Sequence, residues 1–341
     1  MSNDTALKES GFKDRTVLVT GACGTVGAEL VRQLAAAGAG RIVCLDNNET
    51  ELFFLQQTWS GNAAVECYLA DIRDLDALRM RCQGVDIVLH AAALKHVGLC
   101  EESPAQAVRT NIDGTQNVID AALANGVGRV IFTSSDKAVN PTNVMGTSKL
   151  MGERLMTAAS LSNVNANTVF ASTRFGNVLG SRGSVVPLFR RQIEGGGPIT
   201  LTDPDMTRFI MTLEEAVALV LRSAHLATGG EVFVTKMPVA KIEHIAEHMR
   251  ARLANTKIAI KVIGAKPGEK MYEELMNDEE VRRSYEIDDF FVVLPAFVKP
   301  DAGRYPLIAG RPQPDRPYNS SVEPAMDLAE TAAWMDARAI L

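Results

Sequence analysis

The sequence predicts an α/β fold in which one parallel β-sheet carries helices on both of its faces. Two observations support this prediction. Short β-branched runs alternate with longer helical patterns through the first half of the 341-residue chain, and this rhythm is typical of parallel sheets. A glycine-rich turn, with glycines at positions 21, 24 and 27, joins the first expected strand directly to the first expected helix.

The elements of the first half follow in order along the chain. The predicted strands are Thr16–Val19, Arg41–Leu45, Val65–Leu69, Asp86–His90 and Arg129–Ser134. The predicted helices between them are Val26–Ala37, Glu49–Thr58, Leu75–Cys82 and Pro104–Ala124. Ser103 and Gln106 have the spacing of a capping box, with Pro104 at the first helical position, so we expect the last of these helices to begin there.

The pattern loosens after Arg174, where glycine and proline become frequent. Before that point we expect a helix at Asn143–Leu161 and a strand at Thr168–Thr173. After it, Thr212 and Glu215 form a capping box that opens a helix reaching Ala224. The remaining predicted elements are the strands Val232–Thr235 and Lys257–Ile263 and the helices Ile242–Leu253 and Pro324–Ile340.

These elements predict two domains. The main domain takes residues 12–174, and residues 209–235 are expected to return to it. A smaller α/β domain is expected from residues 175–208 and 236–300, over the carboxyl ends of the main strands. Residues 301–341, rich in Pro, Asp, Arg and Ser, are expected to form a tail that wraps the surface.

Composition excludes several classes of function. The net charge is −6, so the chain lacks the excess of basic residues that is typical of a nucleic-acid binder. The five cysteines are odd in number and form no C-x-x-C pair, so we expect reduced thiols and no metal site. Met1–Asp14 is polar, and no apolar run reaches the roughly 18 residues of a membrane span. We therefore expect a cytoplasmic protein without membrane insertion.

The glycine turn predicts a Rossmann-type dinucleotide site. Gly21, Gly24 and Gly27 allow a tight turn whose backbone N–H groups approach a pyrophosphate, and Thr25 and Val26 begin the helix whose positive dipole end faces it. The spacing is a weak signal alone, but here it lies between the strand and the helix that the mechanism requires.

Acidic and small residues at the next strand ends extend this site. Asp46 ends the second strand, where a carboxylate accepts hydrogen bonds from the ribose hydroxyls and repels a 2′-phosphate, so we predict NAD and not NADP. Asp71 and Ile72 follow the third strand and are expected at the adenine. Ala91 and Ala92 follow the fourth strand and leave room for the cofactor.

Longer motifs resemble one known family. They are Ala91–Val97, Ser134–Lys149, Arg174–Ser184, Asp205–Phe209 and Lys266–Leu275. Together with the glycine turn, they resemble the extended short-chain dehydrogenase/reductases, and within them the polysaccharide-biosynthesis branch that contains the UDP-N-acetylglucosamine 4,6-dehydratases. The resemblance covers residues 12–297. Many members of this family carry an N-terminal membrane region, and this chain is expected to resemble the short form that lacks one.

The resemblance implies a hydro-lyase reaction. NAD takes the hydride from C4 of the sugar, water is eliminated across C5 and C6, and the hydride returns to C6. Ser135 is implied to hydrogen-bond the 4-hydroxyl, Asp136 to protonate the departing 6-hydroxyl, and Lys137 to be the base at C5. A basic lysine must be neutral, and burial or nearby cations would lower its pKa. Lys149 is implied to bind the nicotinamide ribose.

One position departs from the family pattern. The residue four before Lys149 is usually tyrosine, and here it is Met145. A thioether has no proton to exchange, so the base at C4 is left open among Asp136, Lys149 and a bound water.

The second half is expected to bind the nucleotide sugar. The resemblance implies substrate ligands at Lys95, Asn177, Arg182, Arg208, Lys266 and Glu269. Arg208 is the expected diphosphate ligand, because a guanidinium binds phosphate oxygens in pairs.

Two other functions fit parts of this pattern. A nucleotide-sugar 4-epimerase would also oxidise C4, but it needs no acid–base pair for C5 and C6. A non-catalytic NAD-binding protein would not need Asp136, Lys137 and Lys149 together. The family fold also implies a homo-oligomer that pairs the helices near residues 104–124 and 143–161.

Overall fold

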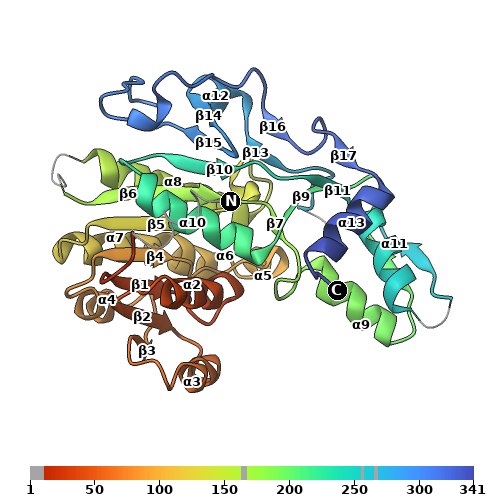
Figure 1. The fold of residues 1–341 in the computed structure, drawn as a ribbon, viewed down its shortest axis with the longest axis horizontal. Coiled ribbons are helices and arrows are strands. Elements are labelled where there is room, and N and C mark those ends of the chain that lie inside the picture. The colour runs from red at the N-terminus through yellow and green to blue at the C-terminus, as the bar shows by residue number, and fades with distance from the viewer. Residues whose placement is uncertain (1–10, 163–166, 255–256, 265–267) are drawn as a thin grey trace.

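A nine-stranded sheet forms the centre of the fold (Figure 1). The computed structural model describes residues 11–162, 167–254, 257–264 and 268–341. The strand order is β14-β15-β10-β6-β5-β4-β1-β2-β3, parallel from β10 to β3 and antiparallel at β15 and β14. This order reverses direction at β1 and β4, which confirms the predicted Rossmann-type, doubly wound sheet.

Seven strands of this sheet lie close to their predicted positions, and the last two, β14 and β15, were not predicted from the sequence. The strands are β1 (Thr16–Thr20), β2 (Arg41–Asp46), β3 (Val65–Leu69), β4 (Ile87–His90), β5 (Arg129–Thr133), β6 (Val169–Arg174), β10 (Val232–Thr235), β14 (Ser284–Ile287) and β15 (Phe290–Val293). Val17, Leu18 and Val19 of β1 are fully buried. A central strand reads as an unbroken apolar run because helices cover both faces of the sheet.

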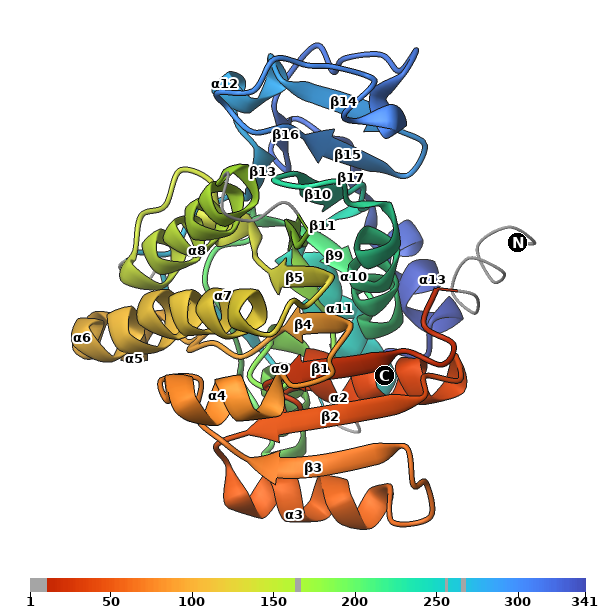
Figure 2. The same ribbon diagram turned by 90° about the vertical axis from the view of Figure 1, so that its left-hand side faces the viewer.

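Two helical layers enclose the sheet (Figure 2). On one face lie α4 (Leu75–Arg81), α7 (Gly114–Ala124) and α8 (Val144–Leu161), and on the other lie α2 (Thr25–Ala36) and α10 (Leu213–Leu226). The helix α3 (Glu49–Thr58) packs beside β3 at the edge. Among the described residues, no helix is both long and apolar enough to cross a membrane.

The predicted helix at Pro104–Ala124 is divided. It consists of α6 (Pro104–Ala107), a π-helical turn η1 (Val108–Asp113) and α7. The predicted capping box at Ser103 is wrong, because the Ser103 side chain makes no capping hydrogen bond. Ser103 also ends the preceding helix α5 (Val97–Glu102), which the sequence did not predict, and its N–H donates to Leu99.

A smaller unit lies beside the main sheet, at the right of Figure 1. Its helices are α9 (Val185–Glu194), α11 (Ile242–Leu253) and α13 (Leu328–Ala337). Its strands are β7 (Asn177–Val178), β8 (Ile199–Leu201), β9 (Thr207–Met211), β11 (Val239–Lys241), β12 (Ile260–Val262) and β17 (Ala325–Met326). Phe189, Ile245, Met249 and Met335 share its buried core, so the tail helix α13 is part of this core.

Parts of the second half belong to the main sheet. The strand β10 pairs in parallel with β6, and α10 packs against α2. The strands β14 and β15 also extend this sheet, although residues 236–300 were expected in the smaller domain. The four residues of β15 are apolar and buried, and pairing with the main sheet removes them from water.

A buried ion network joins the two halves of the chain. Arg174, at the end of β6, is 1% exposed. Its guanidinium donates to both carboxylate oxygens of Glu153 on α8, at 2.7 and 2.6 Å, and to both of Glu280, at 2.8 Å each. Glu280 lies on α12 (Asp278–Val281), and Arg174 also donates to the carbonyl of Leu275 on β13 (Glu274–Met276).

Removing this arginine should strongly destabilise the protein. We expect Arg174→Met to lower the free energy of unfolding by about 3–5 kcal/mol, because two buried carboxylates lose their partner. Denaturant unfolding measures the difference. The control Arg15→Ala removes an exposed pair with Asp86 and should cost about 1 kcal/mol or less. Equal effects of the two variants would contradict this account.

Candidate functional site

Two glycines of the turn, Gly21 and Gly27, have no space for a side chain. Gly21 has a φ of +68°, and a Cβ there would lie 2.7 Å from the Cα of Ala92. A Cβ on Gly27 would lie 2.0 Å from the carbonyl oxygen of Gly21. The turn runs directly into Thr25 and Val26, the first residues of α2, so the backbone of the turn lies at the N-terminus of a helix, as an anion site requires.

A cavity of about 640 Å³, the cofactor cavity, opens from this turn. Gly21, Gly24, Asp46, Asp71, Ile72, Ala91 and Ala92 line it, as the sequence predicted for a dinucleotide site. Asp46 accepts hydrogen bonds from the N–H groups of Cys23, at 2.9 Å, and Asn48, at 3.0 Å. The hydrogen bond from Arg73 lowers the pKa of Asp71 to about 2, so this carboxyl is ionised at neutral pH.

Two buried polar groups lie at the end of β5 and are not among the residues that line this cavity. Lys149, on α8, donates to the carbonyl of Thr133 at 2.9 Å and lies over the ring of Phe132. Burial lowers the pKa of Lys149 to about 8, although Glu153 opposes the shift. The hydroxyl of Ser134 is buried and has no hydrogen-bond partner among the described residues. An unsatisfied buried hydroxyl at a strand end fits a site that a bound polar group completes.

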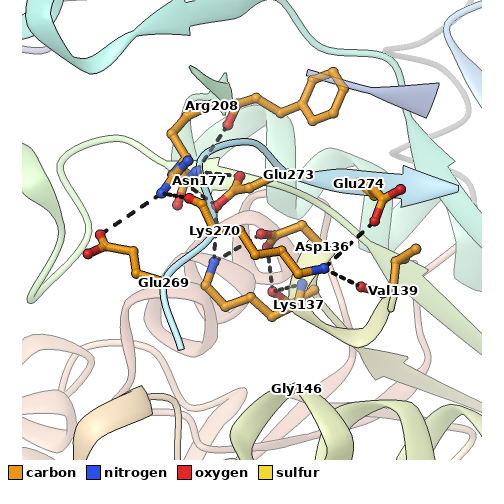
Figure 3. A network of polar contacts seen from close by, with 12 residues as sticks. Asp136, Lys137, Val139, Gly146, Asn177, Arg208, Glu269, Lys270, Glu273 and Glu274 are labelled. Carbon is orange, nitrogen blue, oxygen red and sulfur yellow. Dashed lines mark hydrogen bonds and ion pairs between the residues drawn. The ribbon is translucent and has the colours of Figure 1, made fainter. Parts of the chain in front are cut away.

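A second cavity of about 630 Å³, the substrate cavity, contains the predicted acid–base residues (Figure 3). Asp136 and Lys137 reach it from η2 (Asp136–Ala138), directly after β5. Asn177 comes from β7, Arg208 from β9, and Glu269 from the segment before β13. Residues far apart in the sequence therefore meet at one wall, at the carboxyl ends of the parallel strands.

Asp136 and Lys137 form a close pair. The Lys137 ammonium lies 2.9 Å from Oδ2 of Asp136, and the Ser135 hydroxyl donates to Oδ1 at 2.6 Å. Burial alone would raise the pKa of Asp136. The charge of Lys137 and the hydrogen bonds that the Asp136 carboxylate accepts hold that pKa below its usual range. The expectation of a lowered pKa for Lys137 is wrong: burial acts in that direction, but Asp136 and Glu273 raise the pKa above its ordinary value.

The sequence did not identify Glu273, which is 5% exposed. Its carboxylate accepts from Asn177 at 2.7 Å and from Lys137 at 3.3 Å, and lies 3.2 Å from Nε of Arg208. Burial and the charge of Asp136 raise the pKa of Glu273 to about 7, against the opposing effects of Lys137 and Arg208. One signal was available, because Glu273 lies in the stretch Lys266–Leu275 that carries the family resemblance.

The nitrogens of the Arg208 guanidinium all have partners within the described chain. Nη1 donates to the carbonyls of Thr207 and Met271, Nη2 donates to that of Lys270, and Glu269 lies 3.9 Å away. Arg208 thus ties β9 to the segment that carries Glu273. Its predicted contact with a diphosphate stays a prediction and requires some of these bonds to be exchanged.

The remaining predicted residues lie elsewhere. Met145 packs in an apolar cluster with Cys100 and Ala107. Arg182 lines the cofactor cavity, where it pairs with Glu51 at 2.6 Å, and Lys95 donates to the Arg182 carbonyl. Their role as substrate ligands stays a prediction. Lys266 and residues 1–10 lie outside the described residues.

Comparisons with known proteins show which family the chain resembles. A sequence model of the family described as polysaccharide biosynthesis protein matches residues 17–295. An uncharacterized membrane protein of Methanocaldococcus jannaschii is 49% identical, over 83% of this chain and 87% of its own. A UDP-N-acetylglucosamine 4,6-dehydratase (inverting) of Campylobacter jejuni is 36% identical, over 84% of each chain. A UDP-glucose 4-epimerase of Rickettsia bellii is 38% identical, over 82% of this chain and 83% of its own.

A solved structure shares the whole architecture. The protein Pen from Bacillus thuringiensis superposes with a TM-score of 0.89 at 38% identity, over 97% of this chain and 100% of its own. The nine-stranded sheet and the smaller unit beside it are thus common to both proteins.

The tight packing of the turn predicts the effect of one methyl group. Gly27→Ala should weaken NAD binding by about tenfold or more, equivalent to about 1.4 kcal/mol, because the turn must move away from its new Cβ. Equilibrium dialysis measures the affinity. The control Gly61→Ala adds a Cβ that meets nothing within 4 Å and should bind NAD normally. Unchanged binding by a folded Gly27→Ala would show that the turn does not hold the cofactor.

Proposed function

The chain belongs to the polysaccharide biosynthesis protein family, and we propose that it is a nucleotide-sugar 4,6-dehydratase that acts on UDP-N-acetylglucosamine with NAD as its cofactor. The observation that carries this proposal is the ion pair between the buried Asp136 and the partly exposed Lys137 at the substrate cavity. Elimination across C5 and C6 needs one group that gives a proton and one that takes a proton, held on the same sugar.

The cofactor cavity fits NAD. The glycine turn would hold the pyrophosphate, Asp46 the adenosine ribose, and Lys149 the nicotinamide ribose, where its positive charge favours loss of hydride from the sugar. When bound, NAD supplies a hydride acceptor for C4 that later returns the hydride to C6.

The chain's own residues would move the protons. Ser135 would hydrogen-bond the 4-hydroxyl. Of the three groups left open as the base at C4, we assign Asp136, because its lowered pKa keeps it a carboxylate at neutral pH. Asp136 then carries the proton from the 4-hydroxyl to the departing 6-hydroxyl, which leaves as water. Lys137 would remove the C5 proton and later return one to C5.

Residues next to this pair would recognise the substrate. Asn177, Arg208 and Glu269 line the same cavity as Asp136 and Lys137 and are our proposed nucleotide-sugar ligands. The resemblance assigns Lys95, Arg182 and Lys266 the same role. Arg182, at the cofactor cavity, would then contact the substrate from the cofactor side.

A 4-epimerase is the second candidate, because relatives with that name match the chain at 38% identity. An epimerase also oxidises C4, but it keeps the C6 hydroxyl and does not need a proton donor there. The Asp136–Lys137 pair favours the dehydratase over both the epimerase and a non-catalytic NAD-binding protein.

NMR of the protein with UDP-N-acetylglucosamine in D₂O separates these functions. We expect a new 6-methyl signal with deuterium at C5, because the C5 proton is lost to a base that exchanges with solvent. Ring coupling constants report whether C5 is inverted. A new sugar that keeps its C6 hydroxyl would identify an epimerase, and bound NAD without any new sugar would contradict the dehydratase.

Substitutions at the acid–base pair should stop elimination. We expect Asp136→Asn and Lys137→Met each to lower the rate of 4-keto-6-deoxy sugar formation by about 10²–10⁴-fold, with NAD affinity retained. The control Lys236→Met removes another lysine that pairs with a glutamate, Glu286, outside both cavities. Its activity should be normal. Normal turnover by Lys137→Met would remove the lysine from the reaction.

A further inference from the structure

Glu273 brings a second carboxyl to the proposed acid–base pair. It comes from the C-terminal half of the chain and meets η2 at the end of β5 (Figure 3). The Lys137 ammonium therefore has two carboxylate partners, Asp136 at 2.9 Å and Glu273 at 3.3 Å. Both side chains are at most 6% exposed.

These contacts conflict with a basic Lys137. The two carboxylates hold the lysine in its charged form, and a charged lysine cannot take a proton from C5. A proton acceptor for Lys137 must therefore be present. Asp136 is needed for the proton of the 4-hydroxyl. Among the described residues, Glu273 is the other carboxyl in contact with the Lys137 ammonium.

We propose that Glu273 is a positioning residue that takes a proton from Lys137 and so makes the lysine a base at C5. The inference rests on the proposed dehydratase function. It is new in that it gives the lysine a proton partner to which the resemblance assigned no role.

The proton count closes over one turnover. The hydride leaves C4, the 4-hydroxyl proton passes to Asp136, and the Lys137 proton passes to Glu273. Neutral Lys137 then takes the C5 proton while Asp136 gives its proton to the 6-hydroxyl, so the C6–O bond breaks and water leaves. The hydride adds to C6, Lys137 returns a proton to C5, and Glu273 returns its proton to Lys137. The net change is the loss of one water.

The surroundings of Glu273 suit this exchange. Burial and the charge of Asp136 disfavour a second ionised carboxyl, whereas Lys137 and Arg208 favour one, and the balance leaves its pKa at about 7. Both protonation states are therefore accessible at neutral pH. Asn177 donates to Oε2 at 2.7 Å and orients the carboxyl, and the Ser320 hydroxyl accepts from the backbone N–H of Glu273 at 2.9 Å and holds the main chain.

This role predicts how the reaction depends on pH. Below its pKa, Glu273 already carries a proton and cannot accept one from Lys137. The rate of dehydration by the wild-type protein should therefore fall as the pH drops through about 7. In Glu273→Gln the amide takes no proton, so the rate near neutral pH should be lower by about 10²-fold or more. It should then rise with pH into the alkaline range, as solvent deprotonates Lys137.

The experiment compares these pH profiles by NMR for the wild type, Glu273→Gln, Glu273→Asp and the control Glu286→Gln, which removes a carboxylate paired with Lys236 elsewhere. We expect Glu273→Asp to recover part of the neutral rate and Glu286→Gln to match the wild type. NAD affinity, measured alongside, should be unchanged in Glu273→Gln, because Glu273 does not line the cofactor cavity.

Three outcomes overturn the proposal. A Glu273→Gln rate that is reduced equally at every pH would show a purely structural role. A wild-type rate that is flat from about pH 6 to 8.5 would exclude a proton exchange of this kind, even if the variant failed to fold. An active wild type with an unaffected Glu273→Gln would overturn only this inference, whereas a wild type that forms no keto sugar overturns the proposed function itself.

Discussion

The pairing of buried charges across the two halves of the chain is the constraint on which this structure depends. Arg174 and Arg208 are almost fully buried, and a buried guanidinium is tolerated only when carboxylates or carbonyls satisfy it. Both arginines find their partners on one segment, residues 269–280. Glu273 and the carbonyl of Lys270 serve Arg208, and the carbonyl of Leu275 and Glu280 serve Arg174. The site is therefore complete only when this segment is correctly folded.

This shared segment separates the two tasks of the site. The cofactor cavity is built almost entirely by local structure of the first half, where a strand, a glycine turn and a helix follow one another. The substrate cavity needs both halves, because Asp136 and Lys137 come from one side and Arg208 and Glu273 from the other. Changes in the second half can thus alter the substrate cavity while the glycine turn and the strand ends of the cofactor cavity are left intact.

The same distinction explains what the sequence predicted. The main sheet and the glycine turn were predictable because each depends on residues that are neighbours in the chain. Glu273 was not, because its significance comes from Lys137 and Arg208, which are 136 and 65 positions away. The pKa of Lys137 was predicted in the wrong direction for the same reason: the two carboxylates that raise it cannot be weighed until the fold brings them together. The capping box at Ser103 was predicted wrongly because the sequence did not indicate α5, the helix that ends at Ser103.

Met145 can now be interpreted through its surroundings. It is 4% exposed, and its neighbours Cys100, Ala107 and Val97 make an apolar pocket beneath α5. The thioether therefore contributes packing at the start of α8, and no acid or base is required of it. The groups that would carry protons in the proposed mechanism lie at η2 and before β13. In that mechanism Lys149 serves the cofactor, and the buried carboxyls of Asp136 and Glu273 take part in the proton transfers. Their states are set by Lys137 and Arg208, and not by a phenol next to the nicotinamide.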